Sequence, residues 1–250
     1  MDLQGKVVVI TGGVRDIGRQ VSLKLARSGA KLAINYFGSS KQAEETLKMV
    51  KEIGAEAILV QGDMTREEDV VKFVAETTNA FGAKIDGLVN VAGGLVARKT
   101  LEEIDVEFWD FVMDINLKTC FLLTKAVAPL MTEGGSIVNF ASQAGRDGGG
   151  AESTVYATSK GAVMTFTRCM AKELGPKNIR VNALCPGMIA TSFHDTFTKD
   201  DVRTKVAAGT PLRREGEASE VADLVSYLLS DESTFVTGAN IDVNGGLYFS

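Results

Sequence analysis

Short apolar runs alternate with segments of helical spacing along this whole chain, and that alternation limits the folds open to it. The strand-like runs cover residues 6–10, 31–35, 57–61, 85–90, 136–141, 179–185 and 239–243. The helical segments cover residues 17–28, 40–53, 67–81, 107–131, 154–174 and 217–229. Strands that alternate with helices and are apolar on both faces form a parallel sheet covered on each side. We therefore predict an α/β fold, a Rossmann-like doubly wound parallel sheet of about seven strands with helices on both faces.

Composition excludes several classes of protein. With 45% apolar and 24% charged residues, the chain has the make-up of a soluble globular domain. A formal net charge of −5 without blocks of Lys and Arg leads us to expect no nucleic-acid partner. No apolar run approaches the roughly 18 residues of a membrane span, and a strand-like run starts at residue 6, so we expect neither a membrane segment nor a signal peptide. We predict one cytoplasmic domain over residues 1–250.

Cysteine and histidine are scarce, which narrows the possible sites. Cys120, Cys169 and Cys185 form an odd, widely spaced set in apolar surroundings, so we expect buried, reduced thiols rather than a disulfide or a zinc site. His194 is the only histidine, and sites built from several histidines are therefore impossible. We expect no metal, and the chemistry has to rest on other residues.

A glycine-rich turn, TGGVRDIG over residues 11–18, follows the first predicted strand and opens the first helix. Glycine permits a tight turn and a close approach of the backbone to a ligand, and the helix N-terminus faces a diphosphate. In an alternating α/β chain this position favours a dinucleotide site over an ordinary strand-to-helix turn.

A second motif pairs Tyr156 with Lys160 early in the helical segment 154–174. The spacing i, i+4 puts the two side chains on one face of a helix. A neighbouring ammonium and a positive nicotinamide would stabilise the phenolate and lower the pKa of the phenol from about 10. Ser142 ends the preceding strand-like run, at the ligand-binding edge of a parallel sheet, and this favours a catalytic pair over an ordinary surface pair.

The glycine turn, the N-x-A-G at residues 90–93 and the Y-x-x-x-K pair together resemble the short-chain dehydrogenase/reductase family, and the resemblance covers the whole chain. One departure lies in the turn, where Asp16 replaces the middle glycine of the family's T-G-x-x-x-G-x-G. We expect Asp16 to point outward as a helix N-cap, with Arg15 offsetting its charge. A smaller departure is N-V-A-G in place of the usual N-N-A-G.

The resemblance implies a catalytic set of four residues, with the hydride supplied by the cofactor. Ser142 would bind the substrate carbonyl, Tyr156 would transfer the hydroxyl proton, and Lys160 would bind the nicotinamide ribose and tune Tyr156. Asn116 would hold a water in the proton relay, the alternative being a polar residue that kinks its helix. Expected cofactor contacts are Gly12, Arg15, Asp16, Ile17, Gly18, Asn35, Tyr36, Ser39, Asp63, Met64, Asn90, Ala92, Gly93, Tyr156, Lys160, Pro186, Gly187, Ile189 and Thr191.

The choice of cofactor depends on the end of the second predicted strand. An NAD-specific enzyme places an acid there to bind the ribose 2′-hydroxyl, but no acid occurs between Asn35 and Glu44. Arg15, Asn35, Ser39 and Ser40 can surround a 2′-phosphate instead. We therefore expect NADP(H), with NAD(H) as the alternative.

Two segments are expected to border the substrate. The resemblance implies a lid at residues 192–208, and the segment between Ser142 and Tyr156 is slightly longer than is common in the family. Candidate substrate contacts are Gln143, Arg146, Gly148, Gly149, His194 and Arg203. Among them, Arg146, Arg203 and His194 can bind an anionic, hydroxyl-rich substrate. The alternative is that the glycines only permit a turn and that Arg146 pairs with Asp147.

The segments at residues 141–150 and 185–203 resemble reductases of alginate-derived keto-sugar acids, which reduce a 4-deoxy-5-ketouronate to a 2-keto-3-deoxy sugar acid. A 3-oxoacyl-[acyl-carrier-protein] reductase is the alternative, although an acidic carrier protein would find few basic residues here. The non-enzyme alternative is a dinucleotide-sensing protein, which Tyr156 and Lys160 disfavour.

The partners expected are a small-molecule substrate and further copies of this chain. The family usually forms homotetramers, so we expect a homotetramer here that buries the apolar tail 247–249. A monomer that tucks this tail into its own core fits the residues equally well.

Overall fold

The structure, a computed structural model, describes residues 1–249, and within them seven strands form one sheet in the order β3-β2-β1-β4-β5-β6-β7. The strands are β1 (Val7–Thr11), β2 (Lys31–Tyr36), β3 (Ala57–Gln61), β4 (Ile85–Asn90), β5 (Met131–Phe140), β6 (Arg180–Pro186) and β7 (Asn240–Val243). Every neighbouring pair is parallel. The predicted doubly wound parallel sheet is confirmed.

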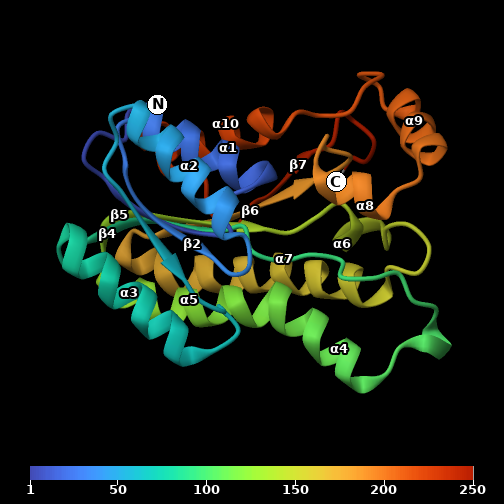
Figure 1. The fold of residues 1–250 in the computed structure, drawn as a ribbon, viewed down its shortest axis with the longest axis horizontal. Helices are drawn as coiled ribbons and strands as arrows, with labels where there is room; N and C mark the ends of the chain where they lie inside the picture. The colour runs from blue at the N-terminus through green and yellow to red at the C-terminus, as the bar shows by residue number, and fades with distance from the viewer. Residues whose placement is uncertain (250) are drawn as a thin grey trace.

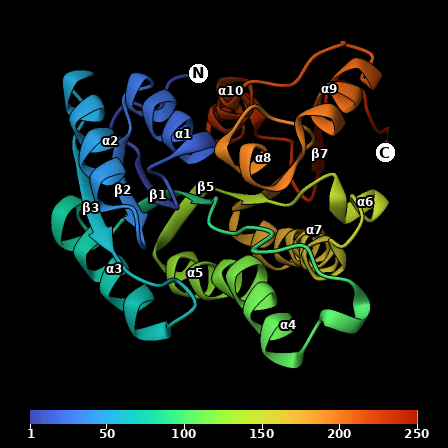
Figure 2. The same ribbon diagram turned by 45° about the vertical axis from the view of Figure 1, so that its right-hand side comes forward.

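Helices cover both faces of the sheet (Figures 1 and 2). One face carries α1 (Asp16–Arg27), α2 (Ser40–Glu52) and α10 (Ala218–Leu229). The other carries α3 (Glu67–Phe81), α4 (Val106–Met113), α5 (Thr119–Val127) and α7 (Thr154–Leu174). Three further helices lie beyond the carboxyl ends of the strands: α6 (Ala144–Asp147), α8 (Ser192–Phe197) and α9 (Asp200–Gly209).

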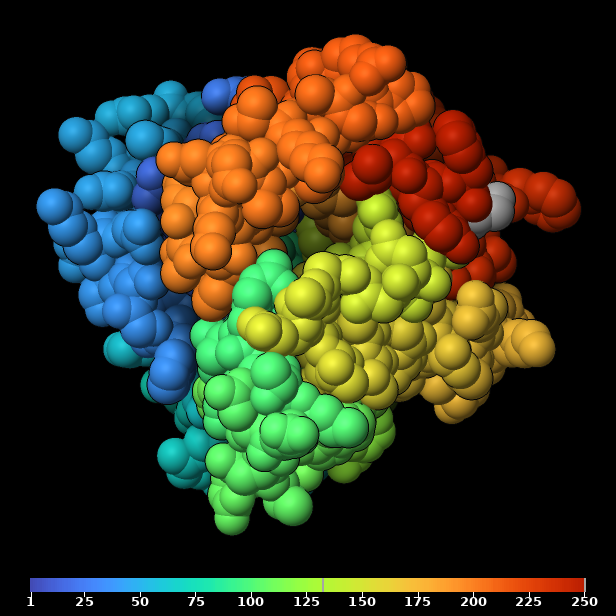
Figure 3. Space-filling view, turned by 90° about the vertical axis from the view of Figure 1, so that its right-hand side faces the viewer, coloured from blue at the N-terminus to red at the C-terminus, as the bar shows by residue number. Residues whose placement is uncertain are grey.

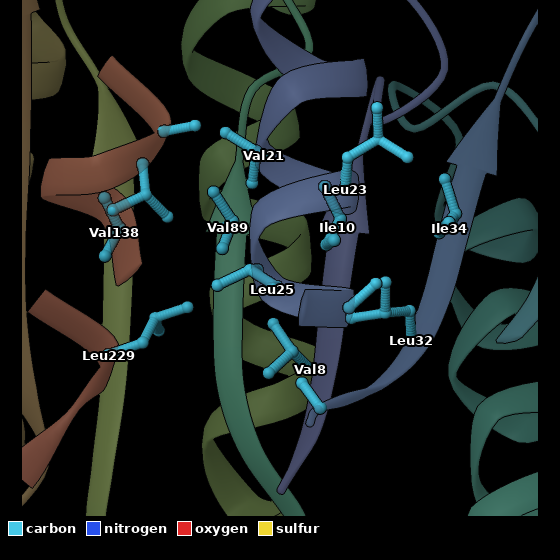
Figure 4. Close-up of a cluster of buried hydrophobic side chains, with 14 of the residues drawn as sticks. Val8, Ile10, Val21, Leu23, Leu25, Leu32, Ile34, Val89, Val138 and Leu229 are labelled. Carbon is cyan, nitrogen blue, oxygen red and sulfur yellow. The ribbon is translucent and has the colours of Figure 1, made fainter. Parts of the chain in front are cut away.

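Successive residues of the central strand β1 supply the cores on the two faces of the sheet. Val8 and Ile10 belong to the cluster that includes Leu25 of α1 and Leu229 of α10 (Figure 4). Val9 belongs to the cluster on the opposite face. Alternation of side chains along a strand makes this two-sided burial possible, and each such buried side chain contributes about 1.5–3 kcal/mol. The continuous apolar strands of the sequence thus reflect two covered faces.

The strand order reverses between β1 and β4, where Thr11 pairs with Asn90. Two buried hydrogen bonds support this place: Asn90 Nδ2 donates to Asn139 Oδ1 at 2.8 Å, and Asn139 Nδ2 donates to Thr167 Oγ1 at 3.0 Å. Ligands of open α/β sheets bind in the crevice that forms at such a reversal. The fold therefore places the crevice between the turn after β1 and the residues after β4.

The helix predicted over residues 107–131 is wrong as a single element. The structure divides it into α4, a π-helical turn (Asp114–Lys118), α5 and a short 3₁₀ turn, and β5 already begins at Met131. Asn116 Nδ2 bonds the carbonyl oxygens of Val112 and Gly94, and Pro129 lacks the N–H that a continuing helix needs. The short helices α6, α8 and α9 were likewise not expected.

The cysteine prediction is confirmed at two positions and wrong at the third. Cys120 and Cys185 are buried, whereas Cys169 is exposed, because it lies on the outer side of α7; none of the three forms a disulfide. Over residues 1–249, no helix combines the length and the apolar character that a membrane crossing requires. In the same range, no three His, Cys, Asp or Glu side chains are grouped so that they can hold a metal ion.

Candidate active site

The glycine turn packs directly against the residues after β4. A Cβ added to Gly12, whose φ is +62°, would lie 3.2 Å from Cα of Ala92, and one added to Gly18 would lie 2.1 Å from the carbonyl oxygen of Gly12. Arg15 occupies the N-cap position of α1 and gives it no capping hydrogen bond, and its Nη1 donates instead to Ser192 Oγ at 3.5 Å. The first N–H groups of α1 therefore lack a capping side chain and suit a phosphate. This cradle fits the diphosphate of a dinucleotide.

Asp16 does not act as the outward-pointing N-cap that we expected. It is the first residue of α1, with φ +47°, and both of its carboxylate oxygens accept hydrogen bonds from Ser192 in α8. The expected neighbour Arg15 does lie beside it, with Nη1 3.7 Å from Oδ2. The carboxylate thus links two segments that meet only in the folded chain.

The side chain of Asn35 is a second correction. It is buried at the end of β2, and its amide donates to the carbonyl oxygens of Tyr36, Val60 and Gly62. Because these bonds hold β2 to the segment after β3, the amide is not left for a ribose phosphate. Ser39, by contrast, takes the N-cap position of α2 and gives it no capping hydrogen bond.

The other expected nucleotide contacts lie at the carboxyl ends of the strands. After β3, Asp63 Oδ1 accepts from the backbone and side chain of Thr65, and Met64 is buried beside it. After β6, the close contact between Gly187 and Asn244 leaves no room for a Cβ. Thr191 Oγ1 donates to the carbonyl oxygen of Ile189 at 3.1 Å.

Lys160 is a buried cation without a carboxylate partner among the described residues. Its Nζ donates to the carbonyl oxygen of Phe140 at 2.8 Å, and burial lowers its pKa from the ordinary 10.5 to about 8. A Cβ added to Gly93, whose φ is +149°, would lie 3.2 Å from this Nζ and 2.5 Å from Asn116 Oδ1. Only glycine therefore permits this approach of the N-x-A-G turn to the ammonium.

The pKa of Tyr156 departs from our expectation. Burial raises it above the ordinary value of 10, and a hydrogen bond with Ser142 partly offsets that rise. Lys160 Nζ lies 5.8 Å from the centre of the Tyr156 ring, so the two side chains share one face of α7 as predicted. The protein alone, however, favours the neutral phenol rather than the phenolate.

The side chain of Asn116 is hydrogen-bonded within the protein through both its nitrogen and its oxygen. Nδ2 donates to the carbonyl oxygens of Gly94 and Val112, each at 2.9 Å, and Oδ1 accepts from the backbone N–H of Gly94 at 3.0 Å. The residue lies in the π-helical turn and is fully buried. Its side chain therefore fixes the loop after β4 and also interrupts the helix, as the alternative reading of this residue expected.

The short helix α8 covers the catalytic residues. Its Phe193 ring centre lies 6.1 Å from that of Tyr156. At its far end, Arg98 donates to the carbonyl oxygen of Phe197 at 3.0 Å and to that of Ala151 at 2.6 Å. Figure 3 shows a hollow where the orange segment of α8 and α9 meets the yellow-green segment around α6.

The two arginines proposed for the substrate are both engaged elsewhere. Arg146 donates a hydrogen bond to Asp242 and not to Asp147, the partner in the alternative prediction. The side chains of Arg146 and Asp242 are both largely buried. Arg203 pairs with Glu215 and Asp195. Their charges are neutralised within the protein, which removes the main support for an anion site at these positions.

The remaining substrate candidates are Gln143, His194, Gly148 and Gly149. Gln143 Nε2 donates to Asp147 Oδ2 at 2.8 Å, while its buried Oε1 has no partner among the described residues. His194 Nδ1 lies 2.9 Å from Thr198 Oγ1, and burial together with Arg203 lowers the pKa of the imidazole. Gly148 and Gly149 both have positive φ, as the predicted turn requires.

Comparison with known proteins identifies the family. The family model described as enoyl-(acyl carrier protein) reductase matches residues 12–248. A 3-oxoacyl-[acyl-carrier-protein] reductase of Staphylococcus epidermidis is 34% identical over 245 residues, which cover 97% of this chain and 99% of that protein. A short-chain dehydrogenase of Burkholderia cenocepacia, solved in complex with NADP, superposes with a TM-score of 0.93 at 30% identity over 99% of both chains. The chain belongs to the short-chain dehydrogenase/reductase family.

Membership makes the protein an NAD(P)-dependent oxidoreductase. A further short-chain dehydrogenase/reductase neighbour is the NADH-dependent reductase A1-R′ responsible for alginate metabolism, with a TM-score of 0.90, 30% identity and 99% of both chains covered. Both relatives expected from the motifs are thus among the similar proteins.

Sequence reasoning missed three residues of this short-chain dehydrogenase/reductase site: Arg98, Ser192 and Phe193. Each contacts a segment far along the chain, so no local pattern marks it. A weak signal did exist for a fourth feature, the contact of α6 with α7. A Cβ at Gly145 would lie 2.7 Å from the backbone nitrogen of Gly161, next to Lys160, and both positions are glycine.

The lowered pKa of Lys160 predicts how stability depends on pH. Between about pH 8 and 10.5 the unfolded chain binds more protons than the folded one, so burial of Lys160 destabilises the protein below pH 8 and this penalty fades as the pH rises. Lys160→Met removes the penalty. Relative to wild type, we expect the free energy of unfolding of the cofactor-free variant to fall by about 2 kcal/mol from pH 7.5 to pH 10 in urea titrations. Exposed Lys172→Met on the same helix is the control, and a pH-independent difference for Lys160→Met would contradict the burial argument.

Proposed function

We propose that the protein is a carbonyl reductase that transfers hydride reversibly between NADP(H) and a ketone or aldehyde. Our preferred substrate is a small acidic keto-sugar such as 4-deoxy-5-ketouronate, reduced to a 2-keto-3-deoxy sugar acid. The observation that carries the proposal is the meeting of Ser142, Tyr156 and Lys160 under Phe193, beside the glycine turn. Residues 1–250 act as one unit that binds the dinucleotide and performs the reaction.

In this mechanism Tyr156 is the acid of the reduction. The reduced nicotinamide supplies the hydride when it is bound. Ser142 and Tyr156 donate hydrogen bonds to the carbonyl oxygen of the substrate, and Tyr156 gives its proton to the alkoxide as it forms. The raised pKa of Tyr156 keeps the phenol protonated before reaction, which suits this direction. Lys160, held by the carbonyl of Phe140, binds a ribose hydroxyl and stabilises the transient phenolate.

Asn116 takes part in the relay through its backbone. Because its side chain is bonded to Gly94 and Val112, we assign the orientation of a relay water to its carbonyl oxygen. Cys120 Sγ lies 3.4 Å from this oxygen and is only a weak donor to it. The proton lost from Tyr156 would then be replaced from solvent through Lys160 and this water.

The preference for NADP(H) rests on the surroundings of the ribose. The side chain of Arg15 is exposed, and the Ser39 side chain makes no capping hydrogen bond to α2. No acidic residue occurs between the end of β2 and Glu44. The Burkholderia cenocepacia relative was solved with NADP. NAD(H) is the second candidate. The Asn35 amide is bound to the carbonyl oxygen of Gly62 and does not bind a 2′-phosphate, and the relative A1-R′ is described as NADH-dependent.

Two substrate classes remain in the proposal. The relative A1-R′, responsible for alginate metabolism, supports the keto-sugar acid. With Arg146 and Arg203 paired, we assign a substrate carboxylate to Arg98, whose hydrogen bonds in the described residues go to two carbonyl oxygens. The Staphylococcus epidermidis relative favours the second candidate, a 3-oxoacyl-[acyl-carrier-protein] reductase.

We also propose a homotetramer in the cytoplasm. Apolar side chains are exposed on α4 and α5, including Phe111 at 53% and Phe121 at 47%, and Phe249 in the tail is 81% exposed rather than tucked into the core. A group of exposed apolar side chains on neighbouring helices supports an interface with another subunit. Free cysteines suit a reducing compartment. A monomeric mass in analytical ultracentrifugation would contradict the tetramer.

Arg15→Ala tests the cofactor assignment. An arginine that binds the 2′-phosphate contributes a charge-assisted hydrogen bond, so we expect the Kd for NADPH to rise at least tenfold while the Kd for NADH changes less than threefold. Nucleotide fluorescence measures both. Equal losses for the two nucleotides would place Arg15 away from the 2′-position, and exposed Arg27→Ala at the far end of α1 is the control.

Tyr156→Phe tests the proton donor. Removal of one hydroxyl leaves the fold and the nucleotide cradle in place, so we expect turnover to fall at least a thousandfold while the Kd for NADPH stays within threefold of wild type. Turnover is followed by NADPH oxidation at 340 nm. Retained turnover would reject Tyr156 as the acid.

A comparison of substrates separates the two classes. We expect a higher kcat/KM for a 4-deoxy-5-ketouronate than for an acetoacetyl thioester, both measured with NADPH. Faster reduction of the thioester would overturn the keto-sugar assignment and leave the carbonyl reductase itself intact.

A further inference from the structure

Asp16 adopts a backbone conformation that glycine tolerates better. Its φ is +47°, in the left-handed region, and it stands where the motif otherwise has its middle glycine. A non-glycine residue is strained there, although Asp and Asn tolerate the conformation better than other residues. A strained residue that persists in a ligand-binding turn points to a role for its side chain.

The side chain of Asp16 binds a single distant residue with both oxygens. Oδ1 accepts the backbone N–H of Ser192 at 3.0 Å, and Oδ2 accepts the Ser192 hydroxyl at 2.6 Å. Hydrogen bonds to a carboxylate are the stronger kind. The N-cap residue of α8 itself, Thr191, gives no capping hydrogen bond, because its hydroxyl donates to Ile189. Asp16 therefore caps α8 from another part of the chain.

The sheet order shows what this contact spans. Asp16 follows β1 and Ser192 follows β6, and β4 and β5 lie between these two strands. At about 4.8 Å per strand, the strands to which Asp16 and Ser192 belong lie roughly 14 Å apart. The link therefore closes over the residues that follow β4 and β5, which include Gly93 and Ser142.

We infer that Asp16 is a positioning residue that fastens the start of α8 to the glycine turn and thereby holds the lid closed over the cofactor crevice. Ser192 is followed directly by Phe193, whose ring lies 6.1 Å from that of Tyr156, so the fastened end of α8 also sets the cover on the acid. Entry and departure of a dinucleotide require this link to open. The requirement for opening rests on the proposed function, because it assumes that a dinucleotide binds in the crevice. The role of Asp16 in holding α8 does not depend on the cofactor.

Variants at position 16 separate the link from the fold. Asp16→Gly removes both hydrogen bonds and also relieves the backbone strain, so the melting temperature should not fall. Asp16→Asn keeps an acceptor for the Ser192 N–H, tolerates positive φ and offers an amide donor to the Ser192 hydroxyl, so it should retain the link. Ser192→Ala removes the bond from the Ser192 hydroxyl to Asp16 and, with it, the longer bond of 3.5 Å that Arg15 Nη1 donates to that hydroxyl. Asn178→Gly is the matched control, because Asn178 also has positive φ (+54°) and is exposed, with no part in the site.

Two readouts follow, the first without cofactor or substrate. In hydrogen–deuterium exchange, peptides covering residues 192–197 should exchange about tenfold faster in Asp16→Gly, about threefold faster in Ser192→Ala and within twofold of wild type in Asp16→Asn and Asn178→Gly. The double variant Asp16→Gly/Ser192→Ala should match Asp16→Gly alone. In stopped-flow displacement, release of NADPH should accelerate in the same order.

The outcomes distinguish this inference from the proposed function. Exchange of α8 within twofold of wild type in Asp16→Gly, or additive effects in the double variant, would overturn the link even if the enzyme reduces its substrate normally. Faster exchange without faster NADPH release would overturn the control of cofactor departure. Failure of the wild type to bind NADPH would reject the proposed function, and the exchange experiment would still decide the position of α8.

Discussion

The active edge of the molecule depends on the parallel pairing of β1 with β4. Thr11 lies opposite Asn90, Thr11 Oγ1 accepts the backbone N–H of Ala92 at 3.2 Å, and Gly12, whose φ is +62°, packs closely against Ala92. Because the crossovers run in opposite directions from these two strands, their loops separate and leave a crevice. The buried bond from Asn90 to Asn139 extends the support to β5, whose end carries Ser142.

Burial without a counter-charge shapes the chemistry of this crevice. Lys160 has a backbone carbonyl as its partner, and burial shifts the pKa values of Lys160 and Tyr156 in opposite directions, each toward the neutral form. Spacing in α7 places the pair correctly, but it does not by itself create a phenolate. The fold thus places a protonated acid, Tyr156, next to a cation, Lys160, whose pKa is low for a lysine. A reduction requires a protonated acid at its start.

Much of the fold could be predicted from local sequence patterns, and the errors of that prediction have identifiable physical causes. The seven strands were predictable because apolar, β-branched runs between helical segments form buried parallel strands. The break in the long helix was not, because it depends on a bond from Asn116 to Gly94, 22 residues away. Helix α8 was missed for a similar reason: its cap comes from Asp16, 176 residues earlier.

The candidate site divides in the same way. Spacing within one segment determined that Tyr156 and Lys160 share a helix face, that glycines follow β1, and that no acid follows β2, because these relations depend only on periodicity and on position along the chain. The tertiary structure decided how charged side chains are used: Arg146 pairs with Asp242, 96 residues away, and the Asn35 amide binds Gly62. An ionic or polar group takes the partner that burial brings to it, and a sequence does not display that partner until the strands are ordered in space.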